Sequence, residues 1–220
     1  MDKQILSAQR QQWQNSFLEM PEMVGADASI PALKAVELFK REDKIKILEL
    51  GSGQGRDTIY FARNGFKVHA LDYSDRGLEA INEDAKELGL SHLITTNVHD
   101  VRNPLPFADE TFDACYSHML FCMALTNAEL EFMTQEIRRV LKPGGVNIYT
   151  VRHTGDPHYG MGIDRGEDMY EVNGFIVHFF SVEKVENLAK GYKIVSVDKF
   201  QEGSLPRKLF CVTLQKISGN

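Results

Sequence analysis

A short apolar run that leads into three glycines constrains this chain more than any other feature. Residues 45–57 read IKILELGSGQGRD, a strand pattern followed by a glycine turn and the start of a helix pattern. A Cβ at Gly51, Gly53 or Gly55 would push a ligand away from the backbone N–H groups of the turn. The following helix adds a partly positive N-terminus that can hold a carboxylate or a phosphate. The pattern predicts a nucleotide-cofactor loop.

The spacing of the glycines distinguishes between two families of such loops. A dinucleotide-binding fingerprint needs glycines at relative positions one, three and six. Here Arg56 occupies the sixth position, the third glycine comes one residue early, and Glu49 stands two residues before the first glycine. The segment ELGSGQG at 49–55 resembles the first motif of the class I S-adenosylmethionine (SAM)-dependent methyltransferases.

This resemblance implies roles for the loop residues. In that family the acidic residue bonds near the methionine end of SAM, which assigns this role to Glu49, and no phosphate has to be accommodated. A polar residue at the end of a strand is the alternative interpretation of Glu49. The remaining cofactor-binding residues that the motif implies are Gly51, Ser52, Gly53 and Gly55.

Two further acidic residues end predicted strands after the glycine loop. Asp72 follows the apolar run 66–71 and precedes Tyr73, and Asp100 follows the strand pattern 92–98. Open α/β sheets bind ligands at the carboxyl ends of their strands. The resemblance implies that Asp72, with Tyr73 beside it, accepts the ribose hydroxyls of SAM. It also implies that Asp100 receives the adenine amino group while the Val101 backbone meets a ring nitrogen.

The segment FDACYS at 112–117 is predicted as the next strand and resembles the fourth motif of the same family, which implies a cofactor contact at Ser117. His118 would then lie beside the transferable methyl group, as a base or as a contact to the acceptor. A packed, hydrogen-bonded histidine is the alternative. No Asn/Asp-Pro-Pro-aromatic element follows, so a nucleobase acceptor is disfavoured.

The end of the chain predicts the sheet topology. Strand patterns at 192–200 and 208–216 are separated by residues 201–207, which are too few for a parallel crossover and must form a hairpin. A helix at 127–141, a Lys-Pro-Gly-Gly turn at 142–145 and a strand at 146–151 precede them. We predict an α/β fold with a doubly wound, seven-stranded, mostly parallel sheet and one antiparallel strand from the C-terminal hairpin, as in the methyltransferases.

We expect a single domain over residues 1–220, with a Rossmann-like core at 44–220. Residues 1–43 predict two helices, at about 3–18 and 31–41, with Ser29 as the N-cap of the second. In small-molecule members of the resembled family, comparable helices cover the cofactor cleft, so this region is expected to be a lid. Trp13 would belong to the lid or serve as an ordinary packing anchor.

Composition excludes several classes of partner. The formal net charge is −6 and the pI is near 5.7, which argues against nucleic-acid or anionic-membrane binding. No apolar run is long enough for a membrane helix and the first residues do not resemble a signal peptide, so a cytoplasmic location is expected. The sequence gives no indication of oligomeric state. The cysteines are expected to be buried reduced thiols, or thiolate ligands in an arsenic-handling methyltransferase; they are Cys115, Cys122 and Cys211.

Residues 152–178 form the longest stretch without a clear helix or strand period. Such segments in compact domains are usually functional or disordered. This one follows the fifth strand at the cofactor edge, so we expect a substrate-side loop in which Arg152 or His153 orients the acceptor. Its apolar walls would come from Tyr159, Tyr170 or Phe175. The alternatives are a solvated excursion and a metal site from His153, Asp156 and His158; we expect no metal.

The sequence therefore predicts a SAM-dependent methyltransferase that acts on a small molecule and releases S-adenosylhomocysteine (SAH). The candidate catalytic residues are His118, Arg152 and His153. The Gly55-Arg56-Asp57 turn and the hairpin end make tellurite-resistance and thiopurine-type enzymes the nearest resemblance. A SAM-binding regulatory or inactive protein remains an alternative. A nicotinamide- or flavin-dependent oxidoreductase fits less well, because the sixth-position glycine is missing and the chain ends in a hairpin.

Overall fold

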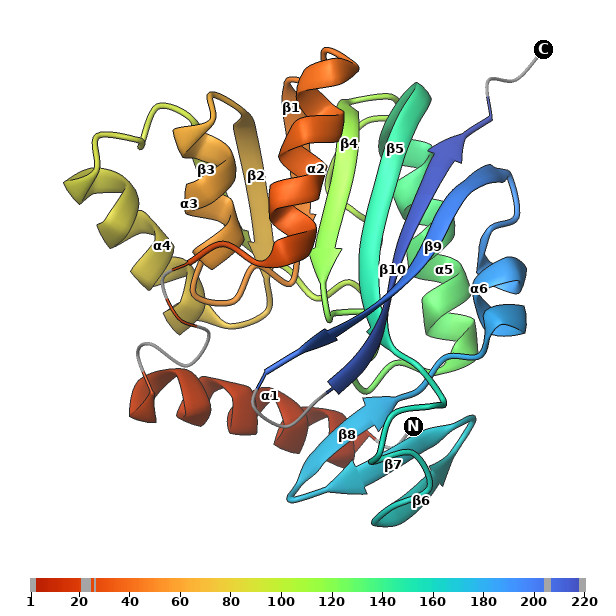
Figure 1. Cartoon of the computed structure of the whole chain (residues 1–220). Coiled ribbons are helices and arrows are strands. Elements are labelled where there is room, and N and C mark those ends of the chain that lie inside the picture. Colours follow the sequence, from red (N-terminus) through yellow and green to blue (C-terminus); the bar gives the residue numbers. More distant parts are fainter. Residues whose placement is uncertain (1–2, 21–24, 26, 204–206, 218–220) are drawn as a thin grey trace.

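The fold is built on one seven-stranded sheet. The structure, a computed structural model, describes residues 3–20, 25, 27–203 and 207–217 (Figure 1). The strands of the main sheet are β1 (Lys46–Leu50), β2 (Lys67–Asp72), β3 (Ile94–Val98), β4 (Phe112–His118), β5 (Leu141–Arg152), β9 (Tyr192–Glu202) and β10 (Arg207–Lys216). Their order is β3-β2-β1-β4-β5-β10-β9, and β10 runs antiparallel to both of its neighbours. The predicted fold class and C-terminal hairpin are confirmed.

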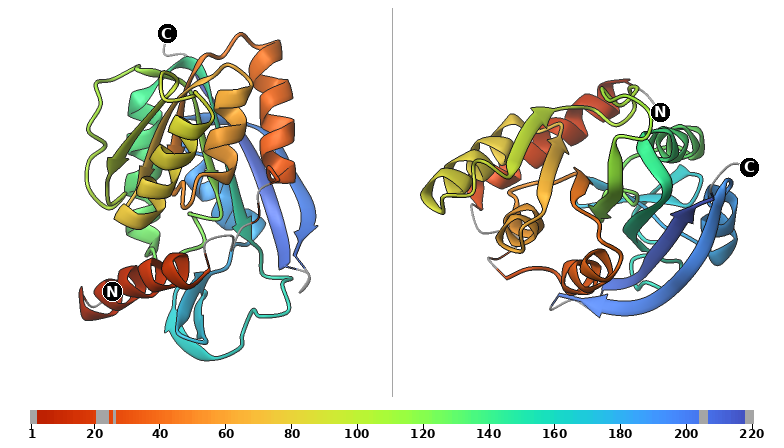
Figure 2. Two further views of the ribbon diagram at one scale, coloured as in Figure 1. Left: turned by 90° about the vertical axis from the view of Figure 1, so that its left-hand side faces the viewer. Right: turned by 90° about the horizontal axis from the view of Figure 1, so that it is seen from above.

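Helices cover both faces of this sheet. They are α1 (Lys3–Glu19), α2 (Ile30–Arg41), α3 (Arg56–Arg63), α4 (Asp75–Glu87), α5 (Asn127–Val140) and α6 (Val182–Leu188). The helices α2, α3 and α4 lie on one face and α5 and α6 on the other, whereas α1 lies outside both layers, across the carboxyl edge of the central strands (Figures 1 and 2). Ser29 caps α2 as predicted, accepting the N–H of Ala32 at 3.2 Å.

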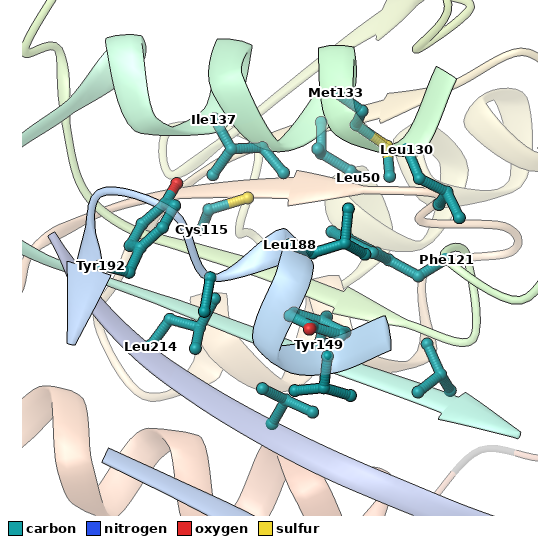
Figure 3. Packing of buried hydrophobic residues seen from close by; sticks show 14 of the residues in the cluster. Leu50, Cys115, Phe121, Leu130, Met133, Ile137, Tyr149, Leu188, Tyr192 and Leu214 are labelled. Atoms are coloured by element: carbon teal, nitrogen blue, oxygen red, sulfur yellow. The ribbon is translucent and has the colours of Figure 1, made fainter. Parts of the chain in front are cut away.

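The largest apolar cluster lies between the sheet and the α5–α6 face. Leu50 and Cys115 from the sheet meet Met133 and Ile137 of α5 there (Figure 3). Alternate residues of β5 point to opposite faces of the sheet, and both faces are covered, so the strand is buried along most of its length. This packing fixes the carboxyl ends of β1, β4 and β5 relative to one another, and these are the ends that carry the site.

Residues 152–178 do not form the irregular loop that was expected. They contain a separate three-stranded antiparallel sheet of β6 (Ile163–Gly166), β7 (Met169–Val172) and β8 (Phe175–His178). Each strand has only four residues, too short for a period to stand out. Two-residue turns with positive φ join them, one at Glu167-Asp168 and one at Asn173-Gly174. Asn-Gly is the strongest short hairpin signal, and it could have revealed the β7–β8 pair.

The strand β5 begins earlier than predicted. The sequence indicated a turn at 142–145 and a strand from Val146, but β5 starts at Leu141. The chain remains paired with β4 across an irregularity, which shifts the register between Phe112 and Ala114. Gly144, with a φ of 70°, keeps the expected glycine conformation.

Among the described residues, no helix is both long enough and apolar enough to cross a membrane. The cytoplasmic location expected from the sequence stays a prediction.

Alanine substitutions at Gly55 and Gly65 allow the cost of a steric clash to be compared with the cost of backbone strain. Both have positive φ, 87° and 88°, but a Cβ on Gly55 would collide with Ile81 of α4, whereas a Cβ on Gly65 would meet nothing within 4 Å. We predict that Gly65→Ala lowers the free energy of unfolding by roughly 1 kcal/mol and that Gly55→Ala lowers it by about 1–3 kcal/mol more. Urea unfolding of the two variants measures the difference; equal losses would contradict it.

Candidate active site

A cavity of about 930 Å³ lies at the carboxyl edge of the main sheet. Its volume is in the upper part of the range for small-molecule and cofactor sites. The glycine loop and the ends of β2, β3, β4 and β5 form its floor, while α1, the small sheet and the β9–β10 hairpin enclose it. Figure 2 shows α1 and the small sheet below the edge at which these strands end.

The glycine loop is held against β2. Gly51 N donates to the Leu71 carbonyl at 2.8 Å, and Gly53 N donates to Asp72 Oδ2 at 2.8 Å. The other carboxylate oxygen of Asp72 accepts the N–H of Ser74 at 2.8 Å. A carboxylate can accept about four hydrogen bonds, so Asp72 retains acceptor capacity toward the cavity.

Three buried carboxyl side chains surround this loop and line the cavity: Glu49, Asp57 and Asp72. Burial raises the pKa of Glu49 well above its usual value, and the negative charge of Asp57 raises it further, although the hydrogen bond that Thr58 Oγ1 donates at 2.5 Å acts in the opposite direction. Burial also raises the pKa of Asp72. The loop end of the cavity is therefore rich in acidic groups and suited to a cationic ligand.

Asp57 is the best-satisfied of the three carboxylates. Its Oδ1 accepts the N–H of Ser29 at 2.8 Å, and its Oδ2 accepts the hydroxyls of Ser29 at 2.7 Å and Tyr116 at 3.0 Å. Because Ser29 is also the N-cap of α2, one carboxylate joins α2, α3 and β4. It thereby fixes the start of α3 beside the glycine loop.

Three buried polar atoms on cavity-lining residues lack a hydrogen-bond partner within the described part of the chain. They are Ser52 Oγ, Gln54 Oε1 and Arg102 Nη1. Buried polar atoms are usually hydrogen-bonded, so these atoms are available to a ligand. On the same side, Asp100 Oδ1 accepts from the backbone N–H and the Nε of Arg102 at 3.1 and 2.9 Å, and Val101 and Tyr73 complete the lining.

His118 lines the cavity, but both of its ring nitrogens are engaged. Thr150 Oγ1, 3.0 Å from Nδ1, already accepts the Met119 N–H, so its own hydroxyl proton is free to donate to the ring. The neutral ring then carries its proton on Nε2 and donates it to Glu202 Oε2 at 3.0 Å. Neither nitrogen is therefore left for an acceptor, and the base role predicted for His118 would require one of these bonds to break.

Glu202, which accepts the hydrogen bond from His118, is a charged residue that lines the cavity. Burial alone would raise the pKa of Glu202, but the hydrogen bond from His118 and the positive charge of Arg56 hold it below its usual range. Arg56 Nη2 lies 3.8 Å from Glu202 Oε1. Sequence reasoning missed Glu202 because it lies at the end of β9, far along the chain from every motif, and only the hairpin returns it to the loop.

Arg152 and His153 occupy different environments. Arg152 lines the cavity and forms a two-point ion pair with Asp156, at 3.1 Å from Nε and 2.5 Å from Nη2. His153 is not among the residues that line the cavity; its ring stacks on Phe210 and its Nδ1 accepts the N–H of Gly155. This position, with a backbone bridge to Phe180, does not favour the prediction that His153 orients the acceptor.

Comparison with known proteins identifies the family. The family model described as "Methyltransferase domain" matches residues 47–145. The sarcosine/dimethylglycine N-methyltransferase of Halorhodospira halochloris is 33% identical over 128 residues, which are 57% of this chain and 44% of that enzyme. The chain therefore matches the methyltransferase domain family over residues 47–145. It spans less than half the length of the first curated relatives that it matches.

Solved methyltransferase structures share the fold over nearly the whole chain. The 1,6-didemethyltoxoflavin-N1-methyltransferase of Burkholderia thailandensis, with bound SAH, has a TM-score of 0.76 at 15% identity and covers 98% of this chain and 90% of its own. TehB from Haemophilus influenzae has a TM-score of 0.69 at 15% identity, and the match covers 93% of this chain and 67% of TehB. At these identities the likeness shows the fold alone.

The cofactor of this methyltransferase family is SAM, and the cavity fits it. SAM carries positive charge on its sulfonium and amino groups, which suits the three carboxyl groups at the loop. The same groups would repel the pyrophosphate of a dinucleotide. The antiparallel β10 and the charge of this cavity together disfavour the oxidoreductase alternative.

Two other residues predicted to contact SAM do not line the cavity. The Ser117 side chain, on β4, is completely buried and its Oγ has no hydrogen-bond partner in the described structure. Gly55 lies at the N-cap of α3, where its missing Cβ makes room for Ile81. Its requirement for glycine therefore comes from helix packing.

Contacts between α1 and the small sheet close the cavity. Gln9 Nε2 donates to the Gly174 carbonyl at 2.6 Å, and its Oε1 accepts the N–H of Ile176 at 3.1 Å. Trp13 and Phe175 meet edge to face at 4.9 Å, and both line the cavity. The two tyrosines expected as walls, Tyr159 and Tyr170, do not line it and pack near Phe179 instead.

The cysteines provide no thiolate ligand to the cavity. Burial raises the pKa of Cys122 and of Cys211 to about 11 and also raises that of Cys115, and none of the three lines the cavity. The arsenic-ligand alternative therefore loses its chemical basis.

Within the described ranges no group of three His, Cys, Asp or Glu side chains is placed to hold a metal ion, and Asp156 is occupied by Arg152.

His178 anchors the small sheet to the main body. It is completely buried, and its Nδ1 donates to the Leu125 carbonyl at 2.6 Å. Its Nε2 accepts from Lys184 Nζ at 2.6 Å, which in turn donates to Asp168 Oδ2 at 3.1 Å. Burial and the charge of Lys184 lower the pKa of His178 from 6.5 to about 4.

We predict that this histidine makes the fold acid-sensitive. As pH falls from 6.5 toward 4, the unfolded chain takes up a proton at this position while the folded chain does not, so the free energy of unfolding decreases. The loss reaches up to about 3 kcal/mol, since one pKa unit corresponds to about 1.4 kcal/mol. Urea unfolding across this range should show a steeper pH dependence for the wild type than for His178→Asn, whereas the exposed-site control His92→Asn should match the wild type. Equal slopes for wild type and His178→Asn would refute this.

Proposed function

We propose that this chain transfers a methyl group from SAM to a small-molecule acceptor. The observation that carries the proposal is one cavity with two chemically different ends. The acidic glycine-loop end suits the cationic cofactor, and the other end combines the His118–Glu202 pair with apolar walls from Met123, Val177 and Phe179. A protein that only stored or sensed SAM would have no need of the second end.

The proposed cofactor contacts follow the order of the strands. Asp100 and Val101 at the end of β3 would take the adenine, Asp72 at the end of β2 the ribose, and Glu49 with the glycine loop the methionine end. The support is that these residues line one cavity in this spatial order and that Asp72 has free acceptor capacity.

The chain's own residues would align the acceptor and exclude water. SAM supplies a methyl group already activated by its sulfonium. The helix α1 and the small sheet cover the reacting centre, which strengthens the electrostatic interactions inside it. Glu202, kept as a carboxylate by its low pKa, can accept a hydrogen bond from an O–H or N–H of the acceptor and so direct a lone pair toward the methyl group. His118 positions Glu202.

Turnover distinguishes this proposal from a SAM-binding protein without activity. We expect SAH release only when SAM is mixed with a suitable member of an acceptor panel of alcohols, phenols, amines and thiols. Glu202→Gln should slow that turnover while leaving SAM affinity unchanged. Tight SAM binding with no SAH formed from any class of acceptor would support the binding-protein alternative.

The role of Asp72 can be measured without an acceptor. Asp72→Ala should weaken SAM binding by roughly 1–3 kcal/mol, because ribose hydroxyls would lose their partner in a buried site. Isothermal titration calorimetry gives the affinity, and Asp84→Ala on the exposed side of α4 is the control. A folded Asp72→Ala variant with unchanged affinity would remove this assignment.

The raised pKa of Glu49 gives a second measurement. A positive ligand beside Glu49 lowers its pKa, so SAM binding should release protons. SAH lacks the sulfonium charge and should release fewer. Calorimetry in buffers of different ionisation enthalpy counts these protons, and Glu49→Gln should abolish the difference between the two ligands. Equal proton release for SAM and SAH in the wild type would argue against a cation at Glu49.

A further inference from the structure

One of the arginines in the cavity differs from the others. Among the described residues, four arginines line it, and three of these have carboxylate partners at 2.5 to 3.8 Å. These pairs are Arg56 with Asp57 and Glu202, Arg102 with Asp100, and Arg152 with Asp156. The fourth, Arg207 at the start of β10, forms no ion pair with any residue in the described ranges.

The missing ion pair is notable because Arg207 has a carboxylate directly opposite. Arg207 and Glu202 are register partners across the β9–β10 hairpin, an arrangement in which opposite charges ordinarily pair. The carboxylate of Glu202 instead contacts His118 at 3.0 Å and Arg56 at 3.8 Å. The hairpin thus brings the Arg207 guanidinium to the cavity, while Glu202, the carboxylate opposite it, contacts His118 and Arg56.

Two observations show that the charge of Arg207 acts on the acceptor end. Arg207 is one of the residues that line the cavity, although its side chain is also exposed to solvent. Its positive charge lowers the pKa of Glu202 and opposes the rise in the pKa of buried Cys122, which lies just after the end of β4. Met123, Val177 and Phe179 supply apolar surface in the same cavity.

We propose that Arg207 binds an anionic group of the methyl acceptor. The acceptor is then a small organic anion, a carboxylate or a phosphate ester, with an apolar body. A guanidinium can hold either group through two parallel hydrogen bonds. The carboxylate of SAM would have a different candidate partner, the backbone N–H groups at the N-terminus of α3. A cationic acceptor would be repelled both by Arg207 and by the sulfonium of SAM. This inference rests on the proposed function.

The test uses the SAH-loaded protein and four probes that share a phenyl body. Benzoate and phenyl phosphate are the two anions, benzyl alcohol is the neutral probe and benzylamine is the cation. Ligand-observed NMR titration gives their affinities. We expect at least one anion to bind roughly 5- to 10-fold more tightly than benzyl alcohol, the range for one charge-assisted contact that is partly open to solvent. The stronger of the two anions distinguishes a carboxylate from a phosphate ester.

Two charge-removing variants locate the contact. Arg207→Gln should abolish the anion preference, whereas Lys199→Gln, which removes the same charge from the same hairpin outside the cavity, should retain it. SAH affinity should be the same in both variants. The proposal is overturned if neither anion binds more tightly than benzyl alcohol, or if the preference survives in Arg207→Gln. It is also overturned if Arg207→Gln weakens SAH binding several-fold, since Arg207 would then hold the carboxylate of the cofactor. None of these results alters the test of methyl transfer itself.

Discussion

The concentration of buried carboxyl groups around one glycine turn is the constraint on which the rest of the site depends. Glu49, Asp57 and Asp72 lie within a few residues of the turn or across from it. Burial raises the pKa of Glu49, and the negative charges of Asp57 and Asp72 raise it further. Burying like charges is costly unless each has partners. Much of the local structure supplies them, since Ser29 and Tyr116 bind Asp57, backbone N–H groups bind Asp72, and Thr58 binds Glu49. A cationic ligand would reduce the remaining repulsion among these carboxyl groups.

The opposite end of the cavity carries charged residues from the later part of the chain. The β9–β10 hairpin returns to the carboxyl edge of the sheet, where it brings Glu202 to His118 and Arg207 to the cavity. The order of strands therefore separates an end with three buried carboxyl groups from an end that carries both charges, where Arg152 and Arg207 accompany Asp156 and Glu202. The two ends meet at β4, where His118 is held between Thr150 and Glu202. A methyl donor and an acceptor of opposite charge would be drawn to adjacent positions.

Sequence reasoning predicted the fold, and it named most of the residues that line the glycine-loop end of the cavity, because local patterns specify both. Glycine spacing, strand-terminal acids such as Asp72 and the short hairpin connection each act over a few residues. The acceptor half could not be reached in this way. Glu202 is 84 positions from His118 along the chain and meets it only after the hairpin folds back. The sequence could not show that His153 lies away from the cavity lining, because nearness to a strand end does not decide which way a side chain faces. The small sheet was missed because its strands are too short to show a period, despite the Asn173-Gly174 turn.

A crystal structure of the chain with bound SAH tests the central claim most directly. The account predicts the adenine amino group within hydrogen-bonding distance of Asp100, the ribose hydroxyls on Asp72, and the sulfur between the glycine loop and His118. It further predicts open volume between that sulfur and Glu202, enclosed by α1 and the small sheet. An adenine bound away from Asp100, or a sulfur facing away from the His118–Glu202 pair, would contradict the division of the cavity into a cofactor end and an acceptor end.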